Sequence, residues 1–325
     1  MKKFGNYFLT FFIILFGCCL IIFANSNIVA VHGSVDLFLN AIFPSLFPFL
    51  IVSELLSHTC LISFLSLKFE RIMKPIFNVP GIGSYPLILG LISGYPVGAK
   101  IVSNLRINNQ LSKSDAEKLL IFTNNAGPLF IIGTVGCSIY FNSTIGFLLL
   151  LVHLISSITT GIIFGNFYKF PYRNSSNNSI SSELSFSSLG EIISNSIKKS
   201  FQTLSIVCGF VVLFSLIISI IQISGILAFL NNEWLSYLIL GLLEITSGIN
   251  LISTISSSNL FWNLVITAFL LGNGGISVLL QVWSIISKTD LSIKPYVFGK
   301  IFNAFLSAII MAILLIIFPF FQFSI

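Results

Sequence analysis

Two polar, glycine-rich interruptions lie inside long apolar segments of the chain, and their residue types suit ligand binding. They read TNNAGP over 123–128 and LGNGG over 271–275. Proline removes a backbone donor and disfavours the helical conformation at the residue before it. A helix broken there presents free N–H groups and the positive end of its dipole to an anion. The same residues would also permit close helix packing without any ligand. The predicted substrate-binding residues at the breaks are Asn124, Asn125, Gly127, Asn273 and Gly275.

A carboxylate and a tight turn supply the other candidate binding groups. Glu244 lies in the apolar segment 235–257, where an ionisable side chain is costly and marks a functional site. It would bind a polar substrate atom or carry a coupling proton, and a structural hydrogen bond to the opposite half is the alternative. Thr246 and Ser247 follow it as further candidates. Ser93 and Tyr95 belong to the turn signal Ser-Gly-Tyr-Pro in the middle of another apolar run.

Lys100 is the cation nearest to that turn. It closes the hairpin and is predicted to point into a cytoplasmic vestibule, where it would be the cation nearest to an anionic substrate. The alternative is a charge that only orients the chain in a membrane. No other Lys or Arg is expected inside the apolar segments. The chain has no phosphate loop, no metal-ligand spacing and no defensible Ser/His/Asp grouping. The sequence therefore predicts no enzyme, no catalytic residue, no bound metal and no cofactor.

Composition identifies the solvent in which these residues act. Charged residues make up 8% of the chain, hydrophobic residues 55%, and the mean hydropathy is +1.01. A soluble domain carries about 25% charged residues, so we expect the lipid bilayer to be the main surroundings of this chain. The net charge of +6 comes from clustered cations. It indicates membrane orientation rather than a nucleic-acid partner.

The charge clusters constrain how the apolar segments cross the membrane. All 16 Lys and Arg residues fall into five clusters that can be placed on the cytoplasmic side. That placement requires the segments 82–104 and 235–257 to enter the bilayer and return as re-entrant hairpins. The alternative is nine complete crossings with one or two clusters misplaced. Residues 25–35 lack Lys and Arg and are expected to form an outside loop. The full set of apolar segments is 7–24, 36–57, 82–104, 119–139, 145–166, 201–225, 235–257, 262–286 and 301–321.

An internal repeat supports the hairpins. Leu89-Gly90-Leu91 matches Leu240-Gly241-Leu242, and Asn125-Ala126-Gly127 matches Asn273-Gly274-Gly275, both with an offset near 150 positions. The sequence therefore predicts an all-α, polytopic membrane protein with inverted repeats, two re-entrant hairpins and two broken helices, a plan typical of secondary transporters. Its expected parts are a first span and outside loop (1–34), a first repeat (35–168, hairpin 82–104, broken helix 119–139), a cytoplasmic Ser/Asn-rich linker (169–200) and a second repeat (201–325, hairpin 235–257, broken helix 262–286).

Three sequence runs resemble a known family. They are FPSLFPFLIVSELL (43–56), LISGYPVGAK (91–100) and NNAGPLFIIGTVG (124–136), and they resemble the sporulation integral membrane proteins known as YlbJ or SpoVV. The resemblance implies a nucleoside recognition, or gate, domain similar to that of concentrative nucleoside transporters. It also implies transport of dipicolinic acid toward the forespore, across the outer forespore membrane. By analogy with nucleoside transporters, a homo-oligomer is a possible assembly.

Two other functions remain open from the residues alone. One is a proton- or sodium-coupled nucleoside transporter of the same fold. The other is a membrane scaffold for spore assembly that transports nothing.

Overall fold

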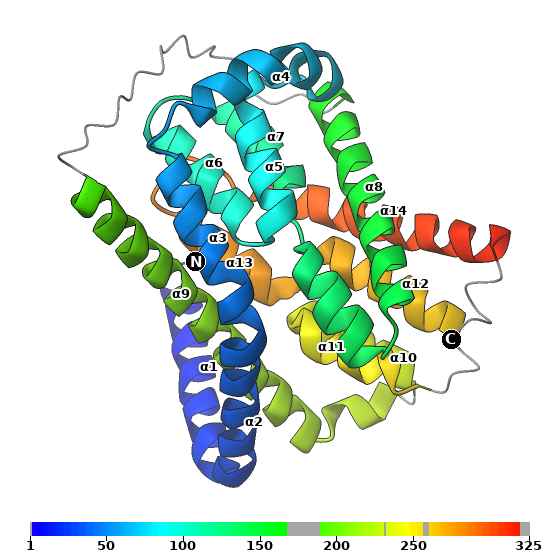
Figure 1. The fold of residues 1–325 in the computed structure, drawn as a ribbon. Helices are drawn as coiled ribbons and strands as arrows, with labels where there is room; N and C mark the ends of the chain where they lie inside the picture. The colour runs from blue at the N-terminus through cyan, green and yellow to red at the C-terminus, as the bar shows by residue number, and fades with distance from the viewer. Residues whose placement is uncertain (1, 168–188, 231, 256–259, 319–325) are drawn as a thin grey trace.

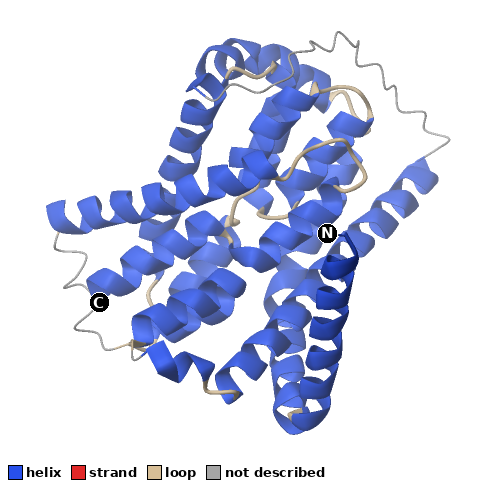
Figure 2. Ribbon diagram, turned by 180° about the vertical axis from the view of Figure 1, so that it is seen from behind, coloured by secondary structure: helices blue, strands red, loops and turns tan. Residues whose placement is uncertain are grey.

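The fold is almost entirely helical, as predicted for this composition. The computed structural model describes residues 2–167, 189–230, 232–255 and 260–318, and no strand occurs within these ranges (Figure 2). A chain surrounded by lipid must satisfy its backbone hydrogen bonds internally, which helices do. The prediction of an all-α, polytopic chain is therefore confirmed.

The N-terminal region contains more helix than the sequence predicts. Helix α1 (Lys2–Ile22) meets α2 (Ala24–Leu37) at a sharp bend of 96°. Helix α2 then runs on through the π-helical turn η1 (Phe38–Ile42) into α3 (Phe43–Leu56). The loop predicted at 25–35 is therefore wrong. The stretch contains no proline and only one glycine, Gly33, and the Asn27 amide donates to the carbonyls of Cys19 and Leu20 in α1.

Helix α4 (Leu61–Phe77) occupies the predicted connection between 57 and 82. It bends 89° away from α3 and lies across one end of the molecule, at the top of Figure 1. It is amphipathic: Ile62, Met73 and Phe77 are buried, whereas the cations of this cluster sit on the other face. The helix ends at Asn78, which adopts the left-handed conformation that commonly stops a helix.

The first predicted hairpin is a pair of short packed helices. After the 3₁₀ turn η2 (Gly81–Gly83), α5 (Ser84–Ser93) and α6 (Val97–Ile107) flank a turn in which Gly94 has φ of 88°. A Cβ on Gly90 would lie 1.9 Å from the Thr123 carbonyl oxygen and 3.2 Å from Gly98 Cα. Glycine is therefore required where the two hairpin helices meet the end of α7.

The two broken helices are interrupted at the predicted residues. Helix α7 (Lys113–Thr123) stops at Asn124, and the chain resumes as η3 (Leu129–Ile139), a π-helical stretch that precedes α8 (Ser143–Phe167). In the second half, α12 (Leu260–Asn273) and α13 (Gly275–Ile286) are separated at Gly274, which has φ of 84°.

The rest of the second half consists of one long helix, a hairpin and a final helix. The second hairpin turns at Glu244, and its two helices touch through Gly241 and Gly248. Residues 189–200, predicted as linker, are helical and begin the long helix, while the linker residues 169–188 and the Ser/Asn stretch 256–259 lie outside the described residues. The elements are α9 (Leu189–Ile223), η5 (Ile226–Leu230), α10 (Glu233–Leu243), α11 (Ile245–Ser253) and α14 (Lys294–Ile317).

Helix lengths separate spanning elements from half-spanning ones. Among the described residues, four helical stretches are long and apolar enough to cross a membrane, and up to six if each of two bent pairs counts as one span. The hairpin helices α5, α6, α10 and α11 have 9 to 11 residues each. At 1.5 Å per residue they extend about 15 Å, roughly half of a 30 Å hydrocarbon core. Such hairpins can reach the midplane but cannot cross.

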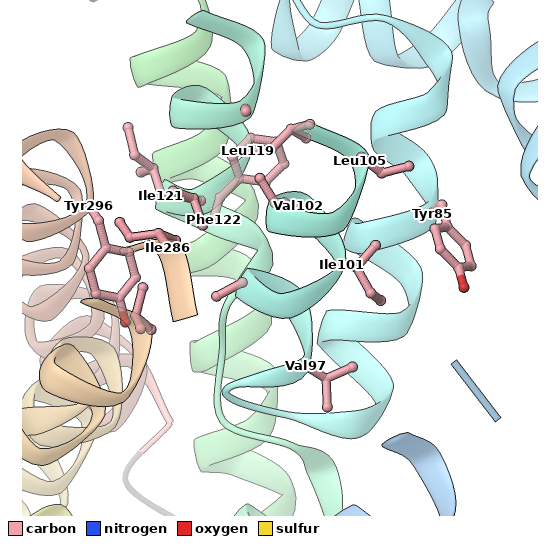
Figure 3. Close-up of a cluster of buried hydrophobic side chains, with 14 of the residues drawn as sticks. Tyr85, Val97, Ile101, Val102, Leu105, Leu119, Ile121, Phe122, Ile286 and Tyr296 are labelled. Atoms are coloured by element: carbon pink, nitrogen blue, oxygen red, sulfur yellow. The ribbon is translucent and has the colours of Figure 1, made fainter. Parts of the chain in front are cut away.

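The core forms two apolar clusters that the two halves share. The cluster around α5, α6 and α7 (Figure 3) also takes up Val278, Val282 and Ile286 of α13. The cluster around α11, α12 and α14 takes up Ile131 and Val135 of η3. The second limb of each broken helix thus packs against the other half as well as its own, with α13 on α6 and η3 on α11. The first limbs also contact the other half, since α7 packs on α14 and α12 packs on α8.

Candidate functional site

A narrow cavity lies where the tips of the two hairpins meet. About 70 Å³ of it is open to water-sized molecules, less than the roughly 300–1,000 Å³ typical of small-molecule sites. The described conformation is therefore a nearly closed one. The cavity is lined by Ser93, Gly94 and Tyr95 of the first tip, Gly127 of the first break, Glu244, Ile245 and Thr246 of the second tip, Ser277 and Gln281 of α13, and apolar residues of α3, η3 and α9.

The first hairpin tip presents unpaired hydroxyl groups to this cavity. Gly94 packs directly on the first break, because a Cβ there would lie 2.7 Å from the Gly127 nitrogen. The side-chain oxygens of Ser93 and Tyr95 are buried and have no hydrogen-bond partner among the described residues. A buried polar group without a partner is unfavourable. Both hydroxyls are therefore available to a ligand.

The second hairpin tip is organised by Glu244. Its carboxylate accepts hydrogen bonds from the backbone N–H groups of Thr246 and Ser247 at 3.0 and 2.8 Å, and from the Ser247 hydroxyl at 2.8 Å. Glu244 is thus the N-cap of α11, where a negative charge is stabilised by the helix dipole. Glu244 thus makes structural hydrogen bonds, but they lie within its own hairpin and not across to the opposite half. Ser247 turns to Glu244 and does not line the cavity.

The predicted asparagines of the first break lie behind the cavity and bind other protein groups. Asn124 and Asn125 are fully buried. The Asn124 amide donates to the Tyr296 hydroxyl at 3.0 Å, and its oxygen accepts from the Ala99 N–H at 3.4 Å. The Asn125 amide donates to the Phe122 carbonyl at 2.6 Å. Their role in this conformation is to hold the break, and neither lines the cavity.

The expectation that no further cation lies within the apolar segments is wrong. Lys300 is 4% exposed and its ammonium nitrogen donates to the Asn125 side-chain oxygen at 3.1 Å. The sequence places Lys300 just before an apolar segment that starts at 301. The helix actually begins at Lys294, so Lys300 lies well inside it, on the buried face that also carries Tyr296 and Asn303.

Helix α14 holds both breaks. While Lys300 binds Asn125, the Asn303 amide donates to the Gly272 carbonyl at 3.0 Å, at the end of α12. One turn further, the Ser307 hydroxyl donates to the Ser156 hydroxyl at 2.7 Å. One face of one helix therefore holds the Asn125 side chain at the first break and the last turn of α12 before the second break.

His153 of α8 also binds the first break. Its Nε2 accepts a hydrogen bond from the Ala126 N–H at 3.1 Å. Accepting at Nε2 requires the neutral tautomer that carries its proton on Nδ1. The imidazole is therefore a packed, structural group in this conformation.

The remaining two predicted residues of the second break are structural in the described conformation. The Asn273 oxygen accepts from the Gly275 N–H at 3.1 Å. Gly275 faces the second hairpin, and a Cβ there would lie 3.4 Å from the carbonyl oxygens of Gly241 and Leu242. Neither residue lines the cavity.

Lys100 is not at the cavity either. Its ammonium group lies 3.5 Å from a carboxylate oxygen of Glu54, in a separate pocket with Lys199. Lys100 therefore does not contact the central cavity in this conformation, and its role in substrate binding stays a prediction. Sequence reasoning placed Lys100 by its distance from the turn, whereas helix α6 turns its side chain toward α3.

Sequence reasoning missed three polar residues of the cavity, namely Ser45 of α3 and two residues of α13. Ser277 and Gln281 are four residues apart on α13, and the Gln281 amide donates to the Ser277 hydroxyl at 3.4 Å. Both are buried and both line the cavity. The spacing of Ser277 and Gln281 could have revealed them, because residues four apart share one helix face. This face follows directly after the second break. Within the described ranges no group of three or more His, Cys, Asp or Glu side chains could hold a metal ion.

Comparisons with known proteins agree with this architecture. Residues 39–166 match the family model of the gate domain, described as nucleoside recognition. The chain is 33% identical over 301 residues to the sporulation integral membrane protein YlbJ of Bacillus subtilis strain 168, with 84% of this chain and 74% of that protein covered. No solved structure matches the chain.

The fold and the match to the gate domain define an integral membrane protein whose hairpins and broken helices enclose a central cavity. The chain belongs to the YlbJ family of sporulation integral membrane proteins. That family comprises membrane proteins of sporulation and is not a family of enzymes.

Proposed function

We propose that this protein is a secondary transporter that moves a small polar molecule across a membrane during sporulation. The observation that carries the proposal is the meeting of two half-length hairpins around one cavity, next to two broken helices. Non-helical backbone within a bilayer is tolerated only where it is buried in protein or lines a wet cavity. Transporters use such breaks to bind substrate near the midplane.

The exchange of packing between the halves supports an inverted repeat. In each half the hairpin helices touch through glycines, Gly90 with Gly98 and Gly241 with Gly248. In each half the hairpin tip rests on the break that follows it. Because each broken helix also packs its second limb against the other half, the two halves form one body around the cavity. We propose that they are related by a two-fold axis in the membrane plane.

We propose dipicolinic acid as the substrate and the outer forespore membrane as the place of action. Support comes from membership of a sporulation family, from the sequence runs described above, and from the two free hydroxyls. Ser93 and Tyr95 would donate to a carboxylate of the ligand. The N-terminus of α11 is not available for this purpose, because Glu244 already caps it.

A nucleoside is the second candidate substrate, and one observation favours it. Glu244 is the one charged residue among those that line the cavity. A carboxylate repels a dianion but accepts hydrogen bonds from the hydroxyl and N–H groups of a neutral ligand. The matched domain is itself described as nucleoside recognition.

Reconstitution tests the proposal and separates the two substrates. Purified protein in liposomes would be assayed for uptake of dipicolinate and of labelled uridine, with and without a proton or sodium gradient. Tyr95→Phe should reduce uptake of the true substrate at least tenfold, since it removes a buried hydrogen-bonding group from the site. Glu244→Gln should reduce uptake at least tenfold only for a neutral substrate such as uridine, because its carboxylate repels a dianion. Glu233→Gln is the matched control, because Glu233 is exposed at the start of α10.

Spore chemistry gives the complementary test in cells. Deleting the gene should leave dipicolinate synthesis in the mother cell intact and deplete it from mature spores. Unchanged spore content would exclude dipicolinate as the cargo. A sporulation defect that every cavity variant rescues fully would indicate a scaffold without transport.

A further inference from the structure

A second and larger cavity lies between the end of α3, helix α6 and the beginning of α9. About 330 Å³ of it is open to water-sized molecules. Glu54, Lys100 and Lys199 line it together with polar residues that include His58, Asn104 and Asn108. It shares no lining residue with the central cavity.

The charges in this cavity do not balance. The Glu54 carboxylate receives Lys199 at 2.6 Å on one oxygen and Lys100 at 3.5 Å on the other. Two ammonium groups therefore share one carboxylate, which leaves one positive charge in excess. The Glu54 and Lys100 side chains are 3% and 10% exposed, so water screens the charge of Lys100 only weakly, whereas Lys199 is half exposed.

Lys100 is the group with unused capacity. Its buried nitrogen makes no hydrogen bond within the described residues, although an ammonium group has three donors. The contact with Glu54 is an ion pair at longer range. An incoming anion could bind Lys100 directly and share Lys199 with Glu54.

We propose that this cavity is a binding site for a small carboxylate anion. Two lysines supply the charge, and the imidazole and amide groups on its wall supply further hydrogen bonds. Glu54 acts as an internal competitor that occupies the lysines when the ligand is absent.

The position of the site suggests its use. Lys100 follows Tyr95 by five residues along the first hairpin, roughly 7 Å at 1.5 Å per residue. The start of α9 and the end of α6 carry the cation clusters that mark the cytoplasmic side. The site is thus a cytoplasmic vestibule above the central cavity. Its role as the first stop of a transported anion rests on the proposed transport function, whereas the binding itself does not.

Anion binding to full-length protein in phosphatidylcholine nanodiscs tests the site. Dipicolinate is the probe, titrated by calorimetry at fixed ionic strength. Lys199→Gln should raise the Kd about tenfold, because it removes a charged donor. Lys198→Gln is the matched control, since this neighbour is also exposed and loses the same formal charge. Its Kd should stay within twofold of wild type.

Glu54→Gln gives a prediction of opposite sign. Removing the competing carboxylate frees both lysines, so the Kd should fall about tenfold. Absence of binding by the wild-type protein, equal Kd values for Lys199→Gln and Lys198→Gln, or weaker binding by Glu54→Gln would each overturn the proposal. Binding that follows the predicted pattern in protein that transports nothing would uphold the site and refute the proposed function.

Discussion

The contact between Gly241 and Gly248 sets the geometry of the second hairpin and gives the sharpest prediction. A Cβ on Gly248 would lie 2.0 Å from Gly241 Cα and 2.5 Å from its nitrogen, whereas ordinary contact begins at 3.4 Å. The obstructing atoms are backbone, so α10 and α11 must separate. Overpacking of this kind costs about 1–3 kcal/mol. Alanine recovers about 0.5–1 kcal/mol through its helix propensity.

Gly248→Ala is therefore expected to lower the free energy of unfolding by about 1–2 kcal/mol, a factor of about 5–30 in the folded-to-unfolded ratio. Unfolding of detergent-solubilised protein by SDS would be followed by tryptophan fluorescence. All three tryptophans, Trp234, Trp262 and Trp283, belong to the second half. Stability at or above the wild-type value would refute the close crossing.

Gly209→Ala is the control for this substitution. Gly209 is exposed on α9 and a Cβ there meets nothing within 4 Å. The same chemical change should be neutral or stabilise the protein by up to about 1 kcal/mol.

Two further predictions concern polar contacts. Asn125→Leu leaves the buried Lys300 nitrogen without its acceptor and should lower the free energy of unfolding by about 1–3 kcal/mol. Adding Lys300→Met should recover most of that loss, because both partners are then apolar. Additive losses in the same SDS assay would contradict the contact. The hydrogen bond from Arg106 holds the pKa of the Asp290 carboxyl below its usual range. The contribution of this hydrogen bond to the free energy of unfolding is therefore present above the pKa of about 3.9 that Asp290 has in the unfolded chain. It is lost as the pH falls through the pKa of Asp290 in the folded protein. Because the pair is partly exposed, Asp290→Asn should lower the free energy of unfolding by no more than about 0.5 kcal/mol at pH 7 and should have no effect in acid. An equal effect at both pH values would exclude this pH dependence.

Backbone features were the part of the fold that the sequence predicted well. Proline, glycine and asparagine act locally on the backbone, so they reveal where a helix must stop even without knowledge of its neighbours. The helix ends at Ser93 and Val97, the break after Thr123 and the break at Gly274 all fall within the predicted stretches.

Side-chain partners were the part that could not be predicted. Asn125 was expected to bind substrate, yet it binds Lys300, which lies 175 positions away in the sequence. Lys100 was expected to be the cation nearest to the substrate site, and its pairing with Glu54 of α3 was not foreseen. The direction of a side chain depends on which helices lie against each face, and a single sequence does not give that packing.

The bonds from α14 have a mechanical consequence. Lys300 and Asn303 lie one turn apart on a rigid rod and hold the two breaks at Asn125 and Gly272. A displacement of one break is therefore transmitted to the other unless a buried hydrogen bond is given up. We therefore expect the two breaks to move together rather than by separate local motions.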